Sequence, residues 1–193
     1  MTNVLRSAAH TVSRRGWLRA ALAGIAAPSM TAGGIAQAAQ SAAYEVTPWT
    51  PGKAAPLLKL ADLVGREWTL GELQGRVVLV NFWATWCEPC RAELPSLNAL
   101  ARQHGAQRLQ VLGINYQETE ARVRRFMETT PVEFPVLLDR DGAVARQWTR
   151  RIFPTTVVVD SRGRPRAVVT GEYDWTSQDA KDLLAPYLRA VAA

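Results

Sequence analysis

The stretch from Val77 to Cys90 reads V-V-L-V-N-F-W-A-T-W-C-E-P-C, and it decides the fold. Its first seven residues form a near-continuous apolar run with β-branched and aromatic side chains, which predicts a central strand covered on both faces. Cys87 and Cys90 follow at the start of a helix that apolar spacing predicts over 89–103, with Gly105 as a stop. A covered strand followed by a cysteine pair at a helix start predicts a redox-active site.

The chemistry of disulfide exchange explains why two cysteines stand at this place. A thiolate attacks the disulfide, and the free N–H groups and dipole of a helix start stabilise a negative sulfur. Two intervening residues leave the second sulfur within bonding reach, so we expect Cys87 to be the exposed nucleophile and Cys90 the more buried resolving thiol. Pro89 falls in the first helical turn, where its missing N–H does little harm.

Two other interpretations of the cysteine pair are weaker. A structural disulfide across so short a loop closes almost no chain and stabilises little. A metal site needs more ligands than the chain offers after residue 38, where His104 is the one histidine. We therefore predict no metal and no cofactor other than the redox-active disulfide Cys87–Cys90, since the sequence holds no flavin or nicotinamide motif.

The positive charge of the chain is concentrated at its N-terminus. The length of 193 residues favours one domain, and 23 Lys+Arg against 17 Asp+Glu give a net charge of +6. Residues 1–38 hold four of the arginines and no acid, which leaves 19 basic and 17 acidic residues in the remainder. This near balance removes most of the electrostatic support for nucleic-acid binding.

Residues 1–38 have the pattern of an export signal. Arg14–Arg15 stand before an uncharged run of small and apolar residues over 20–35, and A-Q-A ends at Ala38, where we predict cleavage. The segment resembles a twin-arginine signal in which Trp17 replaces the usual phenylalanine. It implies a periplasmic, oxidising location and a soluble protein after cleavage, and the alternatives are a Sec signal or an uncleaved anchor.

The rest of the chain divides into a linker and one domain. Residues 39–55 mix Ala, Gln, Pro and Gly without a period, which predicts a linker or an extended lead-in to a domain over 56–193. Strands and helices alternate before a closing hairpin and helix, which favours an α/β fold around a mixed sheet. Besides 77–83, the predicted strands are 57–60, 68–70, 109–115, 136–138, 155–160 and 166–170, and the predicted helices are 89–103, 118–129, 143–148 and 177–191.

The chain resembles the thioredoxin-like proteins of the TlpA/ResA type. The resemblance rests on segment 77–95, which ends C-R-A-E-L-P, on D-L-V-G-R-E-W-T-L-G-E-L-Q-G-R at 62–76, on an insert over 115–134 and on F-P-T-T at 153–156. It implies a thioredoxin-like α/β fold: a central mixed β-sheet flanked by helices, with an N-terminal β-hairpin and a central αβ insert. It also implies an exported thiol–disulfide oxidoreductase.

The resemblance assigns roles to residues on both sides of the cysteines. Cys87 and Cys90 match the redox pair, and Trp86 matches the aromatic residue before it. Pro154 matches the cis-proline that faces the disulfide, with an ordinary proline at a strand start as the alternative. Its implied role is to expose the backbone of Phe153, so that a client segment pairs with it as an added strand.

Glu88 and Pro89 stand between the cysteines, and we expect both to contact the client together with Trp86. The charge of Glu88 opposes a thiolate on Cys87, and a less stabilised thiolate makes the dithiol a better reductant. The sequence C-E-P-C therefore favours reducing chemistry.

Asn81 stands where cytoplasmic thioredoxins carry a buried Asp, and proteins of the TlpA/ResA type often have Asn there. Because Asn cannot relay a proton, another base must activate Cys90. Glu93 falls on the same helix face and matches the active-site Glu of ResA-like proteins. Burial near the sulfurs would raise its pKa towards the working pH, which suits proton transfer, whereas the alternative is a surface Glu paired with Arg91 or Arg102.

These expectations define an exported reductant of disulfides in partner proteins. The resemblance implies apocytochrome c as the client class and a membrane thiol carrier of the CcdA/DsbD type as the electron donor. We expect a monomer and no nucleic-acid partner. Proteins of the DsbE/CcmG type usually have G-x-P-E around the cis-proline, and this chain departs from that pattern with F-P-T-T at 153–156.

Two functions of other classes are kept as alternatives. A thiol peroxidase, which can share the fold, would have Thr three residues before its reactive cysteine, where this chain has Ala84. A copper chaperone for oxidase assembly would have C-x-x-x-C and a downstream His, but no His follows His104. Peroxide consumption and a copper titration test these two alternatives.

Overall fold

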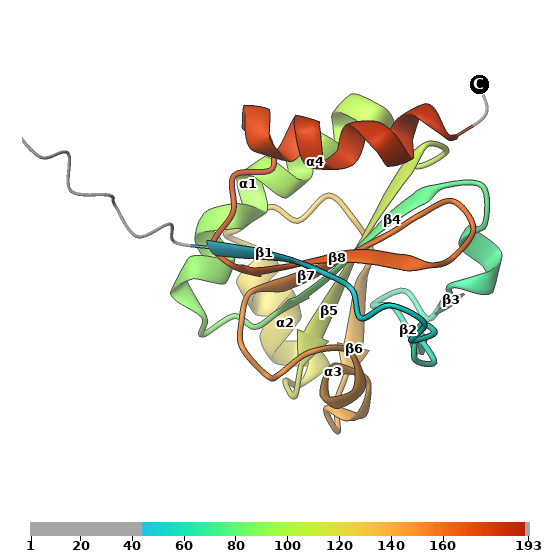
Figure 1. Ribbon diagram of the computed structural model, residues 1–193. Helices are drawn as coiled ribbons and strands as arrows, with labels where there is room; N and C mark the ends of the chain where they lie inside the picture. Colours follow the sequence, from blue (N-terminus) through green and yellow to red (C-terminus); the bar gives the residue numbers. More distant parts are fainter. Residues whose placement is uncertain (1–43, 192–193) are drawn as a thin grey trace, which may run out of the picture. The chain divides into compact units, whose positions relative to one another are not determined.

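A mixed six-stranded sheet forms the centre of the domain, in the order β1-β8-β7-β4-β5-β6 (Figure 1). The computed structural model describes residues 44–191, so the predicted signal peptide 1–38 and its cleavage site lie outside the described residues. Strands β4, β5 and β6 run parallel, and β7, β8 and β1 pair antiparallel in turn. The strands are β1 (Tyr44–Pro48), β4 (Val77–Trp83), β5 (Leu109–Tyr116), β6 (Val136–Asp139), β7 (Thr155–Val159) and β8 (Pro165–Gly171).

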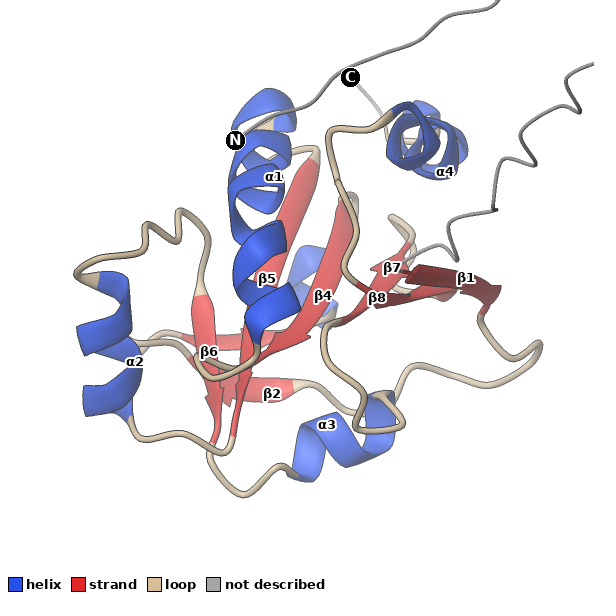
Figure 2. Ribbon diagram, turned by 90° about the vertical axis from the view of Figure 1, so that its left-hand side faces the viewer, coloured by secondary structure: helices blue, strands red, loops and turns tan. Residues whose placement is uncertain are grey.

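The four helices of the described residues, 44–191, cover the two faces of the sheet (Figures 1 and 2). Helices α1 and α4 pack on one face, in a cluster that α2 joins, and α3 packs on the other face together with a short hairpin. The predicted thioredoxin-like α/β architecture is confirmed. The helices are α1 (Glu88–His104), α2 (Glu120–Met127), α3 (Ala143–Trp148) and α4 (Gln178–Arg189), and a 3-10 turn, η1, spans Gly71–Leu73.

Strand β4 shows how one sequence pattern builds two cores. All seven of its residues are buried, as the continuous apolar run predicts. Because successive side chains point to opposite faces, its odd-numbered apolar residues pack against α1, α2 and α4, and its even-numbered ones pack against α3 and the hairpin. The one polar residue of the strand, Asn81, has an odd number and therefore lies on the face that α1 covers.

The predicted N-terminal hairpin consists of β2 (Lys59–Ala61) and β3 (Glu67–Thr69). Asp62 holds its turn, because its carboxylate accepts hydrogen bonds from the backbone of Val64 and Arg66, both at 2.9 Å, and from the Trp68 indole at 2.8 Å. The hairpin also bridges to β6, which it covers at the outer edge of the sheet.

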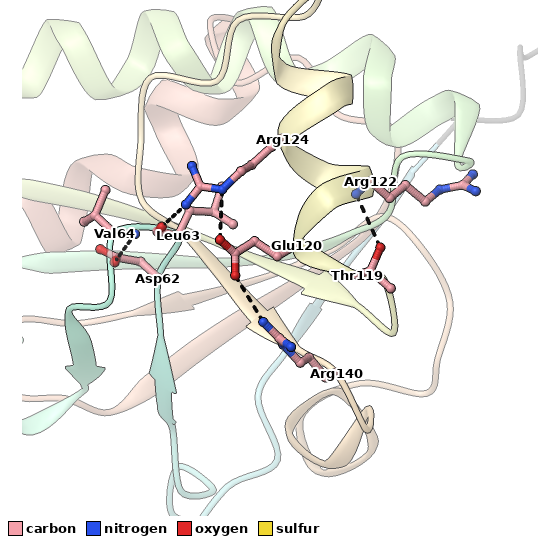
Figure 3. A network of polar contacts seen from close by, with 8 residues as sticks. All are labelled: Asp62, Leu63, Val64, Thr119, Glu120, Arg122, Arg124 and Arg140. Atoms are coloured by element: carbon pink, nitrogen blue, oxygen red, sulfur yellow. Dashed lines mark hydrogen bonds and ion pairs between the residues drawn. The ribbon is translucent and has the colours of Figure 1, made fainter.

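Helix α2, which belongs to the predicted αβ insert, is tied to this hairpin (Figure 3). Arg124 donates to the carbonyl oxygen of Leu63 and, at 2.9 Å, to Glu120, and Glu120 also pairs with Arg140 at 3.2 Å. Arg122 extends from α2 on a side different from that of Arg124 (Figure 3). The two arginines therefore have different environments although they stand two residues apart.

The structure corrects three sequence predictions at the ends of elements. The predicted linker 39–55 contains strand β1, whose half-exposed residues carry too weak an apolar pattern to be recognised. A proline at a strand start is typical of an edge strand, but β8, which begins at Pro165, lies between β1 and β7. Thr176, with Asp179 three residues later, has the spacing of a capping box, but helix α4 is capped by Ser177, which accepts from the backbone N–H of Ala180 at 3.1 Å.

Within residues 44–191, no helix has the length and apolar character needed to cross a membrane.

Candidate active site

The chain turns from the end of β4 into helix α1 with Cys87 as the N-cap residue. Cys87 and Cys90 form a disulfide with 2.03 Å between the sulfurs and 5.3 Å between the Cα atoms. The backbone N–H of Cys90 donates to Sγ of Cys87 at 3.3 Å. A donor of the helix start thus lies against the sulfur that would carry negative charge on reduction.

The two sulfur-bearing residues differ in access to solvent. Cys87 is 6% exposed, whereas Cys90 is completely buried. Between them, Glu88 is exposed and Pro89 is half-buried, and both belong to the first turn of α1. The site therefore offers one sulfur to a partner protein and keeps the other behind it, which is the arrangement that nucleophilic attack and resolution require.

The segment before β7 lies beside the cysteine turn. The Phe153–Pro154 peptide bond is cis, as the resemblance implies, and Pro154 is buried. The rings of Trp86 and Phe153 meet edge to face with 6.2 Å between centroids, and Tyr116 packs on Phe153 at 4.9 Å. Because Trp86 is 58% exposed, an accessible aromatic surface adjoins the disulfide.

Glu93 lies one helical turn after Cys90 and is only 3% exposed. Its carboxyl group accepts a hydrogen bond from the side-chain amide of Asn81 at 2.5 Å and a longer one from the backbone N–H of Tyr173 at 3.4 Å. Burial raises the pKa of Glu93 to about 8, because the loss of hydration outweighs these hydrogen bonds. The predicted burial and the predicted direction of the pKa shift are confirmed.

The alternative of a surface glutamate paired with arginine is wrong for Glu93. Arg102 instead pairs with Glu133 at 2.5 Å, and Arg91 lies over the ring of Phe126. Within residues 44–191, Glu93 forms no ion pair, so hydrogen bonds alone oppose the effect of its burial.

A second buried carboxylate, which the sequence analysis did not identify, holds the active-site turn. Oxygens of Glu118 accept hydrogen bonds from the backbone N–H of Thr85 at 2.7 Å, from the Thr85 hydroxyl at 2.6 Å and from the Asn115 amide at 2.8 Å. Arg122 completes the group with its Nε 2.6 Å from the carboxylate. Since Thr85 stands two residues before Cys87, Glu118 fixes the backbone that leads to the nucleophile.

The order of the predicted strands contained a signal for the contact between Glu118 and Thr85. Strands β4 and β5 are parallel neighbours, so the residues that follow them meet at one edge of the sheet. The apolar periodicity placed Glu118 inside a predicted helix over 118–129, but α2 begins at Glu120 with Thr119 as its cap. Glu118 therefore lies in the connecting turn, where its side chain reaches Thr85.

A thioredoxin-like sheet that carries a C-x-x-C disulfide at a helix start beside a cis-proline defines a thiol–disulfide oxidoreductase. The comparisons agree with this class. Residues 51–168 match the model of the AhpC/TSA family. The thiol-disulfide oxidoreductase ResA of Geobacillus thermodenitrificans is 35% identical over 140 residues, which cover 72% of this chain and 79% of that protein.

Solved structures give the same result. A secreted thiol-disulfide isomerase from Corynebacterium glutamicum superposes with a TM-score of 0.65 and 25% identity, covering 75% of this chain and 92% of the other. A secreted disulfide oxidoreductase of Mycobacterium tuberculosis, homologous to DsbE of Escherichia coli, gives 0.54 and 25%, covering 69% and 95%. The chain belongs to the AhpC/TSA family. Within it, the protein is a thioredoxin-like thiol–disulfide oxidoreductase of the TlpA/ResA type.

Proposed function

We propose that this enzyme reduces disulfides of partner proteins outside the cytosol, with Cys87 as the nucleophile and Cys90 as the resolving thiol. The observation that carries the proposal is the position of Cys90, which is completely buried one helical turn before a buried glutamate with a raised pKa. Such a pair suits the second step of the exchange, in which a hidden thiol must lose its proton.

Reduction of the client disulfide takes two thiol–disulfide exchange steps. In the reduced enzyme, the Cys87 thiolate attacks one sulfur of the client disulfide, which forms a mixed disulfide and releases the other client sulfur as a thiolate. Cys90 then loses its proton and attacks Sγ of Cys87. This attack forms the Cys87–Cys90 disulfide and frees the second client sulfur, so two electrons pass to the client.

Glu93 is the proposed acceptor of the Cys90 proton. A carboxyl group with a pKa of about 8 is close to the ordinary thiol pKa of about 8.5, so a proton passes between the two groups at little cost. In the disulfide form described here, the raised pKa keeps the proton on Glu93 at neutral pH. That state is the expected product of the resolving step.

The client is proposed to bind over Trp86, Glu88 and Pro89 and to pair with the backbone of Phe153 beside Pro154. The exposed ring of Trp86 and its contact with Phe153 support this assignment, since both residues lie on one surface next to Cys87. An extended client segment docked there would carry its disulfide to the more accessible sulfur.

Location, clients and donor follow from relatives and from the sequence. The secreted homologues support a periplasmic enzyme released by cleavage after Ala38, through a twin-arginine signal over 1–38. The similarity to ResA supports a haem-attachment client such as apocytochrome c and a CcdA/DsbD-type thiol donor in the membrane. We propose that the mature enzyme works as a monomer and needs no metal or organic cofactor.

Trapping of the mixed disulfide tests the function. A Cys90→Ala variant expressed in the native compartment should remain covalently joined through Cys87 to its client, which mass spectrometry then identifies. The matched variant Cys87→Ala should trap nothing and should not reduce any client. Equal capture by both variants, or turnover that survives the loss of Cys87, would contradict the proposed function.

A further inference from the structure

A hollow of about 590 Å³ opens beside the active-site turn, between Thr85, which precedes α1, and helix α2. We call it the basic hollow, because two of its lining residues are arginines and none is acidic. Its lining residues are Thr85, Thr119, Ala121, Arg122, Arg125 and Phe126.

Arg122 is held in place at the wall of the basic hollow. Its Nε lies 2.6 Å from the buried carboxylate of Glu118 and 3.0 Å from the hydroxyl of Thr85. Both contacts use Nε, and the side chain is 59% exposed, so the terminal nitrogens keep their capacity to bind a further acceptor. Figure 3 shows this side chain extending away from Arg124, whose charge pairs with Glu120.

A second arginine lines the basic hollow, and a third lies over the ring of Phe126, one of its lining residues. Arg125 stands three residues after Arg122 and is exposed, and it forms no ion pair with any residue of the described chain, 44–191. Arg91, next to Cys90 in sequence, lies over the ring of Phe126 with 6.0 Å to the centroid. Arg122 and Arg125 therefore line the basic hollow together with Phe126, and the acid that contacts Arg122, Glu118, is buried.

The distance to the nucleophile fits a short peptide segment. Thr85 lines the basic hollow and stands two residues before Cys87, so their Cα atoms lie at most about 7.6 Å apart. An extended client spans that distance with two or three residues, at about 3.3 Å each. A client side chain two or three residues from the attacked cysteine would therefore come within reach of the hollow that Thr85 lines.

We propose that the basic hollow binds an acidic side chain of the client, two or three residues from the client disulfide. The inference rests on the proposed function and adds a substrate preference to it. A carboxylate complements the two arginines of the lining, and Arg122 is already oriented by Glu118, so less side-chain freedom is lost on binding.

Three oxidised peptides that differ at one position test the proposal. Each carries one disulfide, with Glu, Gln or Lys three residues from the cysteine, and kcat/KM for reduction by the reduced enzyme is measured at low and high salt. We expect the order Glu over Gln over Lys, with a threefold to fivefold span between Glu and Lys at low salt, roughly the effect of exposed ion pairs. The span should shrink at high salt, because the charges are screened.

Two charge-reversal variants locate the effect. Arg125→Glu should invert the order of the three peptides. Arg162→Glu changes the charge equally at an exposed turn after the far end of β7, and it should keep the wild-type order. Equal rates for all three peptides at low salt, or an unchanged order in Arg125→Glu, overturn the basic hollow as a client site. Failure to reduce any of the peptides counts against the proposed function itself.

Discussion

Two glutamates are buried at the active-site turn, one on the α1 side and one on the α2 side, and their surroundings differ. Glu118 is surrounded by donors: the backbone and hydroxyl of Thr85, the amide of Asn115 and the guanidinium of Arg122. Glu93 has the amide of Asn81 and one long backbone hydrogen bond, and no cation contacts it within the described chain.

The difference shows how one residue type serves two purposes within one site. A carboxylate that binds a cation and three further donors fixes the geometry of the turn around it. A carboxyl group whose burial is poorly compensated has its pKa raised, in this case to about 8, and becomes a group that exchanges a proton near neutral pH. The polar partners, rather than burial alone, separate the two roles.

The largest effect expected of a single substitution at pH 7 is the loss of stability in Glu118→Ala. Glu118→Ala leaves the Thr85 N–H and the Arg122 guanidinium without their shared acceptor, so we expect a loss of roughly 3 kcal/mol in the free energy of unfolding. Urea unfolding at pH 7 measures it. The control Glu120→Ala removes a more exposed acid that pairs with two arginines, and it should cost less than about 1 kcal/mol. Equal losses would show that Glu118 is not a structural anchor.

The second prediction concerns stability against pH at Glu93. Between pH 4.5 and about 8 the folded oxidised protein keeps a proton on Glu93 that the unfolded chain has released. The contribution of Glu93 to the free energy of unfolding is therefore complete below pH 4.5 and is lost as the pH rises to about 8. The loss is on the order of a few kcal/mol. In Glu93→Gln the contribution should be absent. Unfolding curves of the wild-type protein and of Glu93→Gln at pH 5 and pH 8 test this prediction. The same change in the free energy of unfolding in both proteins would be evidence against a raised pKa of Glu93.

A smaller effect is expected from the hydrogen bond that Asn81 donates to Glu93. Asn81→Leu removes a donor that lowers the pKa of Glu93, so this pKa should rise by about one unit, the equivalent of one hydrogen bond. Carbon-13 NMR of the labelled carboxyl group follows the titration. Asn98→Leu is the matched control, because Asn98 is a buried α1 residue bonded to the backbone around Pro131. It should leave the titration of Glu93 unchanged.

The smallest expected effect comes from Glu172, an exposed acid whose charge raises the pKa of Glu93. Glu172→Gln should lower this pKa by a few tenths of a unit, and the shift should fade in high salt. The same NMR titration measures it, with Glu128→Gln, at the exposed residue that follows α2, as a charge-matched control. A shift of equal size in both variants would mean that net charge, rather than the position of Glu172, is responsible.

The sequence predicted the parts of the fold that depend on local pattern. Strand 77–83 and helix 143–148 have the predicted bounds. The continuous apolar run determines the extent of the strand, and the short periodic run determines that of the helix. Strand β1 was missed, since its stability comes from pairing with β8, which lies more than a hundred residues later in the chain.

The candidate site divides in the same way. The cysteine pair and Pro154 belong to recognisable local motifs, and the structure shows the disulfide and the cis bond that these motifs implied. The face of Asn81 also follows from the alternation of β4. The role of Glu118 depends on a contact between the loops that follow the parallel strands β4 and β5. Apolar periodicity within one segment does not predict a contact between two loops.

Strand β1 has a practical consequence for anyone who shortens this chain. Apolar patterning alone would place the start of the domain at Pro56. A protein truncated there would lose β1 and expose the backbone N–H and C=O groups of β8 that pair with β1. It would also lose the link from the Tyr44 hydroxyl to Asp179, at 2.9 Å. The unpaired N–H and C=O groups of an edge strand pair with other chains. Such a fragment should therefore aggregate or swap strands, whereas a fragment that starts before Tyr44 should not aggregate.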